Sequence, residues 1–127
     1  MIELRRYVDG RGKDVFGEWF SRLKDPRAKA KIAIRLDRLA LRKVWRLQAL
    51  REGLCELRID WGPGYRVYYT MLGKACVLLL GGGDKKQQSA DIERAPACMK
   101  DYKEGLRDNE TQNKHLSRRS AHARTAR

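Results

Sequence analysis

Two arginines and two lysines in the middle of the chain have the side chains that bind phosphate groups. Arg58 and Arg66 lie in two segments that alternate apolar and polar residues, with Gly62-Pro63-Gly64 between them. If the chain reverses at this turn, the two arginines become cross-strand neighbours on one face of a hairpin. Two guanidinium groups placed there can hold one phosphate through paired hydrogen bonds. Lys85 and Lys86 follow the next predicted strand, so we expect them beside the same face.

The groups that could transfer protons are fewer. Residues 1–106 contain no histidine, so we do not expect histidine acid–base catalysis,. Glu56 and Asp60 share the predicted face of Arg58, where they could pair with it as exposed ions, a contact that contributes only about 0–1 kcal/mol. Alternatively, Glu56 could orient an arginine or act as a base, and the sequence does not separate these roles. Tyr68 lies on the same face and could stack on a base or donate a proton, although tyrosine more often packs in a core.

A second group of cations lies on a predicted helix. Asp25-Pro26 is a typical helix start, and the apolar spacing continues to about residue 42,. No acidic residue interrupts the row of cations along one side of this helix. Their mutual repulsion costs a few tenths of a kcal/mol per pair, which a polyanion would relieve. The row is either a solvated face or a contact surface for RNA or the ribosome, and it consists of Arg27, Lys31, Arg35, Arg38 and Arg42.

The overall charge indicates a polyanionic partner. The chain has 127 residues, 29 Lys and Arg, 16 Asp and Glu, and a formal net charge of +13. Residues 1–106 account for 23 of the basic and 14 of the acidic residues, so the predicted folded part carries +9 by itself. Nucleic acid is the first expected partner of such a domain. No apolar run is long enough to span a membrane, and MIELRRYVDG is unlike a signal peptide,.

The three cysteines and the apolar periodicity predict a single cytoplasmic domain. The cysteines are far apart and form no metal-ligand or disulfide pattern, so we expect neither a metal nor a cofactor,. We expect an α+β domain over residues 1–106, with helices against one face of a mostly antiparallel sheet, and a disordered basic tail over 107–127. The predicted elements are a strand at 2–8, helices at 14–24 and 26–42, strands at 54–61, 65–71 and 75–80 (the last ended by Gly81–Gly83), and a helix from about 89–91 with Pro96 in its first turn or at a kink.

Two motifs, in this order, resemble a known family. Gly53 to Tyr69 reads G-x-C-E-L-R-I-D-W-G-P-G-Y-R-V-Y-Y, and Leu78 to Ala95 reads L-L-L-G-G-G-D-K-K-Q-Q-x-x-D-I-x-R-A. Together they are similar to the phage-derived addiction-module killer proteins, the HigB branch of the RelE/ParE toxin superfamily. A weaker likeness lies in F-x-E-W-F-x-x-L-K-D and A-x-A-x-I-x-x-R-L-D-R-L. The resemblance covers roughly residues 5 to 105, and the sequence departs from it in the basic 42–53 loop, at Pro96 and in the tail.

The resemblance implies a RelE-like fold with an N-terminal helical hairpin and a C-terminal helix. It also implies a toxin of a type II toxin–antitoxin pair: a cytoplasmic, metal-independent endoribonuclease that cleaves mRNA, commonly on the ribosome. Its partner would be a cognate antitoxin, expected to be a helix-turn-helix protein, and DNA would be met only through that complex. Arg58 and Arg66 would stabilise the scissile phosphate, and Lys85 would stabilise charge or transfer a proton. The expected RNA-binding residues are Lys86, Arg27, Lys31, Arg35, Arg38 and Tyr68.

Two other functions fit the same sequence. A ParE-like protein would bind DNA gyrase without cutting RNA, and the cluster of Arg58, Arg66 and Lys85 favours the nuclease over it. A non-catalytic RNA- or ribosome-binding module would use the basic helix for affinity, and its binding would be salt-sensitive without any product.

Overall fold

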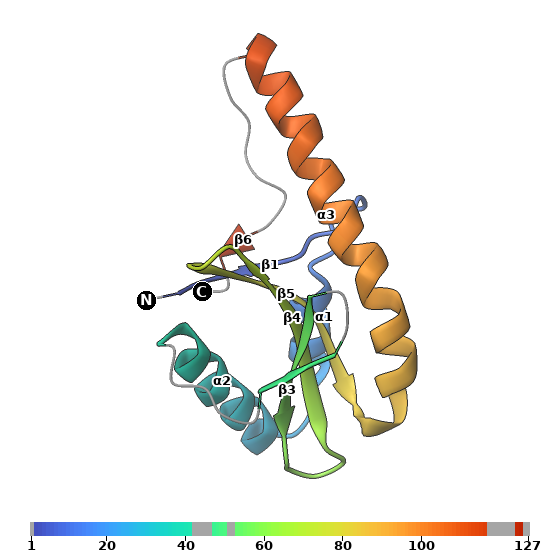
Figure 1. Ribbon diagram of the computed structural model, residues 1–127. Coiled ribbons are helices and arrows are strands. Elements are labelled where there is room, and N and C mark those ends of the chain that lie inside the picture. The colour runs from blue at the N-terminus through green and yellow to red at the C-terminus, as the bar shows by residue number, and fades with distance from the viewer. Residues whose placement is uncertain (1, 42–46, 51–52, 117–123, 126–127) are drawn as a thin grey trace.

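The computed structural model describes the backbone of residues 2–41, 47–50, 53–116 and 124–125, and the side chains of these residues except 47–48, 106–116 and 124–125. In this part of the chain, six strands form one mixed sheet in the order β2-β3-β4-β5-β1-β6, and helices cover both of its sides (Figure 1). The α+β class predicted from the sequence is confirmed. The elements are β1 (Glu3–Arg6), α1 (Val15–Arg22), α2 (Pro26–Ala40), β2 (Leu47–Ala49), β3 (Leu54–Ile59), β4 (Tyr65–Leu72), β5 (Cys76–Asp84), the 3-10 turn η1 (Lys85–Gln87), α3 (Gln88–Leu116) and β6 (Arg124–Thr125).

One side of the sheet packs against α1 and α2. The carboxylate of Asp25 caps α2 by accepting a 2.9 Å hydrogen bond from the backbone N–H of Arg27, and Pro26 occupies the first turn, as the sequence predicts,. Apolar side chains of both helices recur every three or four residues, so they form a stripe that faces the strands. The core of this side includes Phe16, Ile32, Leu36, Leu39, Leu57, Ile59, Val67, Tyr69, Val77 and Leu79.

Helix α3 covers the opposite side of the sheet, so the prediction of helices on one face only is wrong. The reason lies in β5, which carries Val77 and Leu79 on the α1 and α2 side and Leu78 and Leu80 on the other. A strand that is apolar on both faces must be covered on both. The second core joins residues of the sheet and α3: Tyr7, Leu54, Tyr68, Leu78, Leu80, Ala95, Met99 and Tyr102.

The predicted hairpin is present with the predicted register. Strands β3 and β4 are antiparallel, and Arg58 pairs directly with Arg66. The turn between them contains Gly62 and Gly64, whose φ angles of 56° and 82° are ones that side-chain-bearing residues rarely adopt,. β5 pairs antiparallel with β4 and parallel with β1. This arrangement places the hairpin tip next to the end of β5 and the start of α3.

The three glycines of β5 continue the strand, although the sequence analysis expects them to end it. Gly81, Gly82 and Gly83 remain paired with β4 as far as Asp84. Their role is to admit close neighbours: a Cβ on Gly82 would lie 2.3 Å from the Trp19 ring. A run of glycines, which is typical of a turn, is here part of a strand whose packing requires small residues.

The C-terminal region also differs from its prediction. Helix α3 begins at Gln88 and extends to Leu116, and β6 pairs with β1, where the sequence analysis expects a disordered tail. Residues 107–116 lack apolar periodicity, but Glu, Gln, Lys and Leu among them are good helix formers that can extend an existing helix. Pro96 lies well inside α3, beyond its first turn. β2 occupies part of the predicted 42–53 loop. Among the described residues, no helix has the length and apolar character needed to cross a membrane.

Candidate phosphate-binding site

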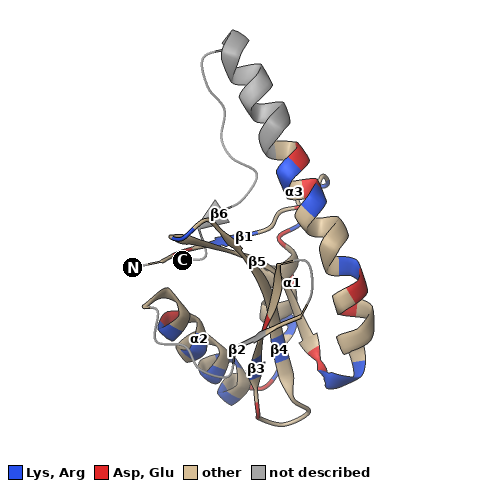
Figure 2. Ribbon diagram, in the orientation of Figure 1, with Lys and Arg blue, Asp and Glu red and all other residues tan. Residues whose placement is uncertain are grey.

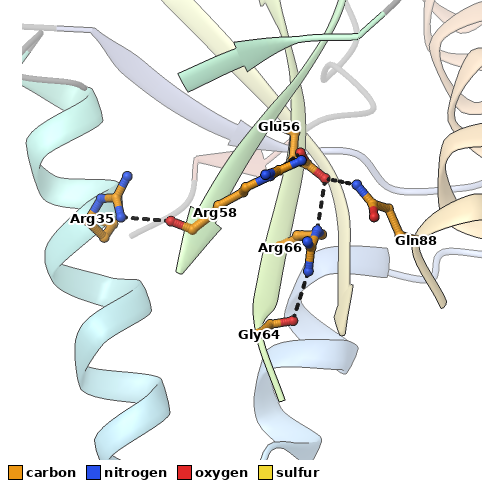
Figure 3. Close-up of polar contacts among 6 residues, drawn as sticks. All are labelled: Arg35, Glu56, Arg58, Gly64, Arg66 and Gln88. Carbon is orange, nitrogen blue, oxygen red and sulfur yellow. Dashed lines mark hydrogen bonds and ion pairs between the residues drawn. The ribbon is translucent and has the colours of Figure 1, made fainter. Parts of the chain in front are cut away.

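A completely buried carboxylate organises the polar side of the β3–β4 hairpin. Glu56 of β3 is 0% exposed. Its Oε2 accepts a 2.9 Å hydrogen bond from Arg58 Nε, and its Oε1 accepts one of 2.8 Å from Gln88 Nε2 (Figure 3). Arg66 Nε lies 3.1 Å from the same Oε1 as an ion pair without hydrogen-bond geometry. One carboxylate thus joins two adjacent strands to the first turn of α3.

Glu56 does pair with Arg58, but the prediction that both ions are exposed is wrong, because Glu56 is buried. Gln88 brings α3 over this part of the sheet, and that covering helix removes Glu56 from solvent. A buried carboxylate has a large cost of desolvation, which its three partners offset. Because Glu56 is enclosed by these side chains, its role in the structure is to position the arginines, and it is not placed to touch a substrate.

The two arginines have different surroundings. The side chain of Arg58 is 41% exposed, whereas that of Arg66 is 9% exposed. Arg66 also donates from Nη1 to the carbonyl oxygen of Gly64 at 3.2 Å, which ties it to the hairpin turn. Arg58 is held through its backbone, because its carbonyl oxygen accepts a 2.7 Å hydrogen bond from Arg35 Nη1 of α2 (Figure 3). Arg58 can thus reach a ligand at the surface, and Arg66 forms the wall behind it.

An open hollow at the hairpin tip brings together the three predicted catalytic residues. It has a volume of about 480 Å³, and we call it the basic hollow; Arg58, residues 59–65, Arg66 and Lys85 line it. Lys85 lies close because the strand leads directly into η1, whose start is capped by the Asp84 carboxylate accepting from the backbone N–H of Gln87 at 3.2 Å. Lys86 is exposed in the same turn and does not line the hollow.

Part of the predicted basic row on α2 continues this surface. A second hollow, lined by Lys31, Ile34, Arg35, Arg38, Ile59 and Asp60, shares its last two residues with the basic hollow. Figure 2 shows the cations along α2 beside the hairpin. Arg27 is exposed near the start of the helix and lines neither hollow, and Arg42 lies outside the described residues.

Trp61 connects α2 to the hairpin turn. The ammonium of Lys31 lies 4.6 Å from the centre of the indole ring, in a cation–π contact,. The indole N–H donates to Asp25 Oδ2 at 2.9 Å, and this hydrogen bond lowers the pKa of the Asp25 carboxyl. The cap of α2 therefore also fixes the aromatic edge of the hollow.

The structure does not place Tyr68 where it could stack on a base at the surface. It is 2% exposed and belongs to the core beneath α3. Burial raises the pKa of its phenol, with a further contribution from the nearby Asp91. The position is on the polar side of β4, as predicted, but the packing of α3 covers its ring.

Chemically, the basic hollow can bind and neutralise an anion with oxygen atoms. Arg58 of β3 and Lys85 of η1 line it from different elements, and Arg66 adds a third positive charge,. The side chain of Lys85 can both stabilise charge and carry a proton. In the described part of the chain, His, Cys, Asp and Glu form no group of three that could hold a metal ion.

Two positioning contacts in the structure are not predicted from the sequence. Gln88 belongs to the D-K-K-Q-Q segment already noted in the sequence, but its partner lies 32 positions earlier. Arg35 is predicted to contact RNA, and in the structure its guanidinium also supports the β3 backbone. A pair of amides after two lysines at a helix start is the signal that could identify Gln88, the second of the pair, as a residue turned toward the sheet.

No protein-family profile matches the chain. The chain is similar to a Haemophilus influenzae protein described as uncharacterized: 46% of residues are identical over 80 positions, which cover 63% of this chain and 81% of the relative. Identity at this level over most of a protein's length indicates common descent and a shared fold. The chain belongs to the same protein family as this Haemophilus influenzae protein.

Proposed function

We propose that this protein is the toxin of a type II toxin–antitoxin pair, a RelE/HigB-like endoribonuclease that acts on mRNA. The observation that carries the proposal is the joining of Arg58 and Arg66 through one buried carboxylate, with Lys85 lining the same hollow. Preorganised cations of this kind stabilise the charge that develops on a phosphate during transfer. The RelE/ParE-like fold belongs to this proposal and is supported by the element order and by the two sequence motifs.

The proposed reaction is an internal transesterification. The ribose 2′-oxygen forms a bond to the neighbouring phosphorus while the bond from phosphorus to the 5′-oxygen breaks. The 2′-proton passes to a base, the 5′-oxygen gains a proton, and the products carry a 2′,3′-cyclic phosphate and a 5′-hydroxyl. Arg58 holds the phosphate oxygens, Arg66 adds positive charge behind it, and Lys85 is the candidate for delivering the proton to the leaving oxygen.

The basic row on α2 would supply affinity for the rest of the RNA or for the ribosome. Lys31, Arg35 and Arg38 adjoin the basic hollow, so one strand of RNA could contact both. A cognate antitoxin would inhibit the protein by covering this surface, and the proposed site of action is the cytoplasm.

The test is RNA cleavage by purified protein, alone and with ribosomes. Arg58→Ala should lower the cleavage rate about 100-fold or more, because it removes a charge donor that acts on the transition state. Lys85→Ala should lower the cleavage rate by a larger factor than it lowers RNA affinity. Lys103→Ala, which removes an exposed cation elsewhere on α3, is the matched control and should leave the rate unchanged.

The same measurement separates the alternatives. Full cleavage by Arg58→Ala and Lys85→Ala would remove the catalytic assignment. Salt-sensitive RNA binding with no product in any variant would favour the non-catalytic binding module. The complete burial of Glu56 is a specific argument for that module, because a buried carboxylate cannot act as a base on RNA. Inhibition of gyrase supercoiling without RNA cleavage would favour the ParE-like function.

A further inference from the structure

A further pocket, separate from the two hollows described above, lies between α1 and α3, where β5 extends beyond β1. β1 pairs with β5 only over Cys76–Leu79, whereas β4 pairs with β5 as far as Asp84. The edge of β5 that faces away from β4 is therefore not paired with β1 beyond Leu79. The pocket has a volume of about 400 Å³, and we call it the α1–α3 pocket. It adjoins the basic hollow through η1, because Lys85 lines the hollow and Gln87 lines the pocket.

Two buried polar atoms in residues that line this pocket have no hydrogen-bond partner among the described residues. They are Tyr68 Oη and Asp91 Oδ2, and the two residues are 2% and 9% exposed. The other carboxylate oxygen of Asp91 accepts from Arg94. Leaving a buried polar group unpaired destabilises the folded state. A ligand that supplied partners for both atoms would remove this cost.

The remaining walls suit a flat ring with an attached anion. Trp19 lies directly against Gly82 of β5, so that a Cβ on Gly82 would be 2.3 Å from its ring. The wall of the pocket therefore contains an aromatic ring that packs on the backbone of β5. Lys13 also lines it, together with two arginines that are paired with carboxylates of the same wall, Arg22 with Glu18 and Arg94 with Asp91.

From these features we infer that the α1–α3 pocket binds a nucleobase, and that Tyr68 and Asp91 recognise its polar edge. A base offers a flat face to Trp19, N–H and acceptor groups to the two unpaired oxygens, and a phosphate to the cations. The inference rests on the proposed function if the base and the phosphate in the basic hollow belong to the same RNA strand. In that case the pocket sets the base preference of cleavage, and Tyr68 acts through its hydroxyl and not by stacking.

The environment of Asp91 agrees with this role. Burial raises the pKa of its carboxyl, while Arg94 opposes the shift. The carboxyl can therefore accept a hydrogen bond from a base when ionised or donate one when protonated.

The test measures base preference in binding, separately from cleavage. The probes are fluorescent 2′-deoxy hexanucleotides that differ in one base, which lack the 2′-hydroxyl needed for the proposed reaction, and the four nucleoside 5′-monophosphates. We expect the wild type to bind one base at least 10-fold more tightly than the least favoured base. Asp91→Asn and Tyr68→Phe, both nearly isosteric, should each reduce this ratio at least fivefold.

Two matched controls address folding and charge. Tyr69→Phe removes an equally buried hydroxyl on the opposite face of the sheet, and Glu93→Gln removes an exposed carboxylate from α3. Both should keep the wild-type preference, and circular dichroism should confirm that all four variants are folded. Arg58→Ala should weaken binding of every hexanucleotide to the same extent.

The outcomes separate this inference from the proposed function. Equal binding of all bases, or an unchanged preference in Asp91→Asn and Tyr68→Phe, would overturn the inference even if RNA is cleaved. A preference that depends on the pocket in a protein that cuts no RNA would support the inference and contradict only the nuclease. A preference seen with the monophosphates alone would support the pocket and assign the base to a free nucleotide.

Discussion

On the side of the sheet covered by α1 and α2, Leu57 and Val67 point into a layer of aliphatic and aromatic side chains. On the α3 side, their chain neighbours Glu56 and Arg66 form an ion pair at almost the same depth. Both sides are built from the same two strands, and alternation along each strand separates them. One side of the hairpin is thus buried by apolar contacts alone, whereas the other combines a second apolar core with a polar network.

The difference indicates which side is adapted for binding. An apolar layer needs only complementary volume, whereas a buried carboxylate must be satisfied by partners in a fixed geometry. Apolar residues of similar size often replace a buried ion pair without loss of stability. The polar side therefore contains interactions that stability alone does not require, and the basic hollow opens next to them.

The largest effect that would test this comparison is the loss of the buried carboxylate. We expect Glu56→Ala to lower the free energy of unfolding by about 3–5 kcal/mol, because Arg66 would keep its buried charge without an ionic partner. The double variant Glu56→Leu with Arg66→Met removes both charges and should recover most of that stability while losing RNA affinity. Urea unfolding followed by circular dichroism gives the stabilities.

Leu57→Ala is the matched variant for the apolar side. Leu57→Ala should lower the free energy of unfolding by about 2–5 kcal/mol. Because Leu57 has no charged partner, no second substitution can recover this stability by removing a charge. If the double variant at positions 56 and 66 were as unstable as Glu56→Ala, the network would be essential for packing, and the contrast between the two sides would be wrong.

A smaller effect is expected where α1 approaches β5. Gly82→Ala would place a Cβ 2.3 Å from the Trp19 ring, so that the helix or the indole must move. Overpacking of this kind costs about 1–3 kcal/mol. Thermal unfolding checks the value. Gly10→Ala, at a position with no heavy atom within 4 Å of a new Cβ, serves as the control; an equal loss in both variants would show that the contact is unimportant.

The sequence predicts the parts of this fold that depend on local patterns. Alternation over the β3–β4 hairpin gives both strands and the register that pairs Arg58 with Arg66. The Asp25-Pro26 cap gives the start of α2. The placement of α3 could not be predicted in the same way, because it depends on how two apolar faces of β5 are shared among three helices. The glycines of β5 are misassigned because each admits a side chain from a neighbouring helix, as Gly82 admits Trp19, and local composition does not reveal such contacts.

The candidate site divides in the same way. The sequence brings Arg58, Arg66 and Lys85 together because strand register and chain continuity place them. It does not predict the burial of Glu56, since that requires Gln88 to approach from a helix on the far side of a turn. Nor does it predict the enclosure of Tyr68, because tyrosine is compatible with both surface and core. Residues fixed by local geometry were identified, and those fixed by tertiary packing were not.

The smallest expected effect concerns Asp91, the other buried carboxyl on the α3 side. Burial raises its pKa in the folded protein, with opposition from Arg94 and a further increase from Asp84. The folded state therefore binds the proton more tightly than the unfolded chain, whose Asp pKa is about 3.9. The stability associated with the protonated carboxyl is fully present below that value and is lost as the pH rises through the folded pKa.

Asp91→Asn should consequently gain stability relative to the wild type as the pH rises from about 4 toward 7. A single group can change this difference by no more than about 1.4 kcal/mol per pH unit. Urea unfolding of both proteins at each pH gives the difference, and Glu93→Gln, at an exposed position of the same helix, should show no such trend. A constant difference between wild type and Asp91→Asn would mean that Asp91 is as well solvated as an ordinary carboxyl. The α3 side would then hold one buried carboxylate, at Glu56, and the polar network would be confined to the hairpin.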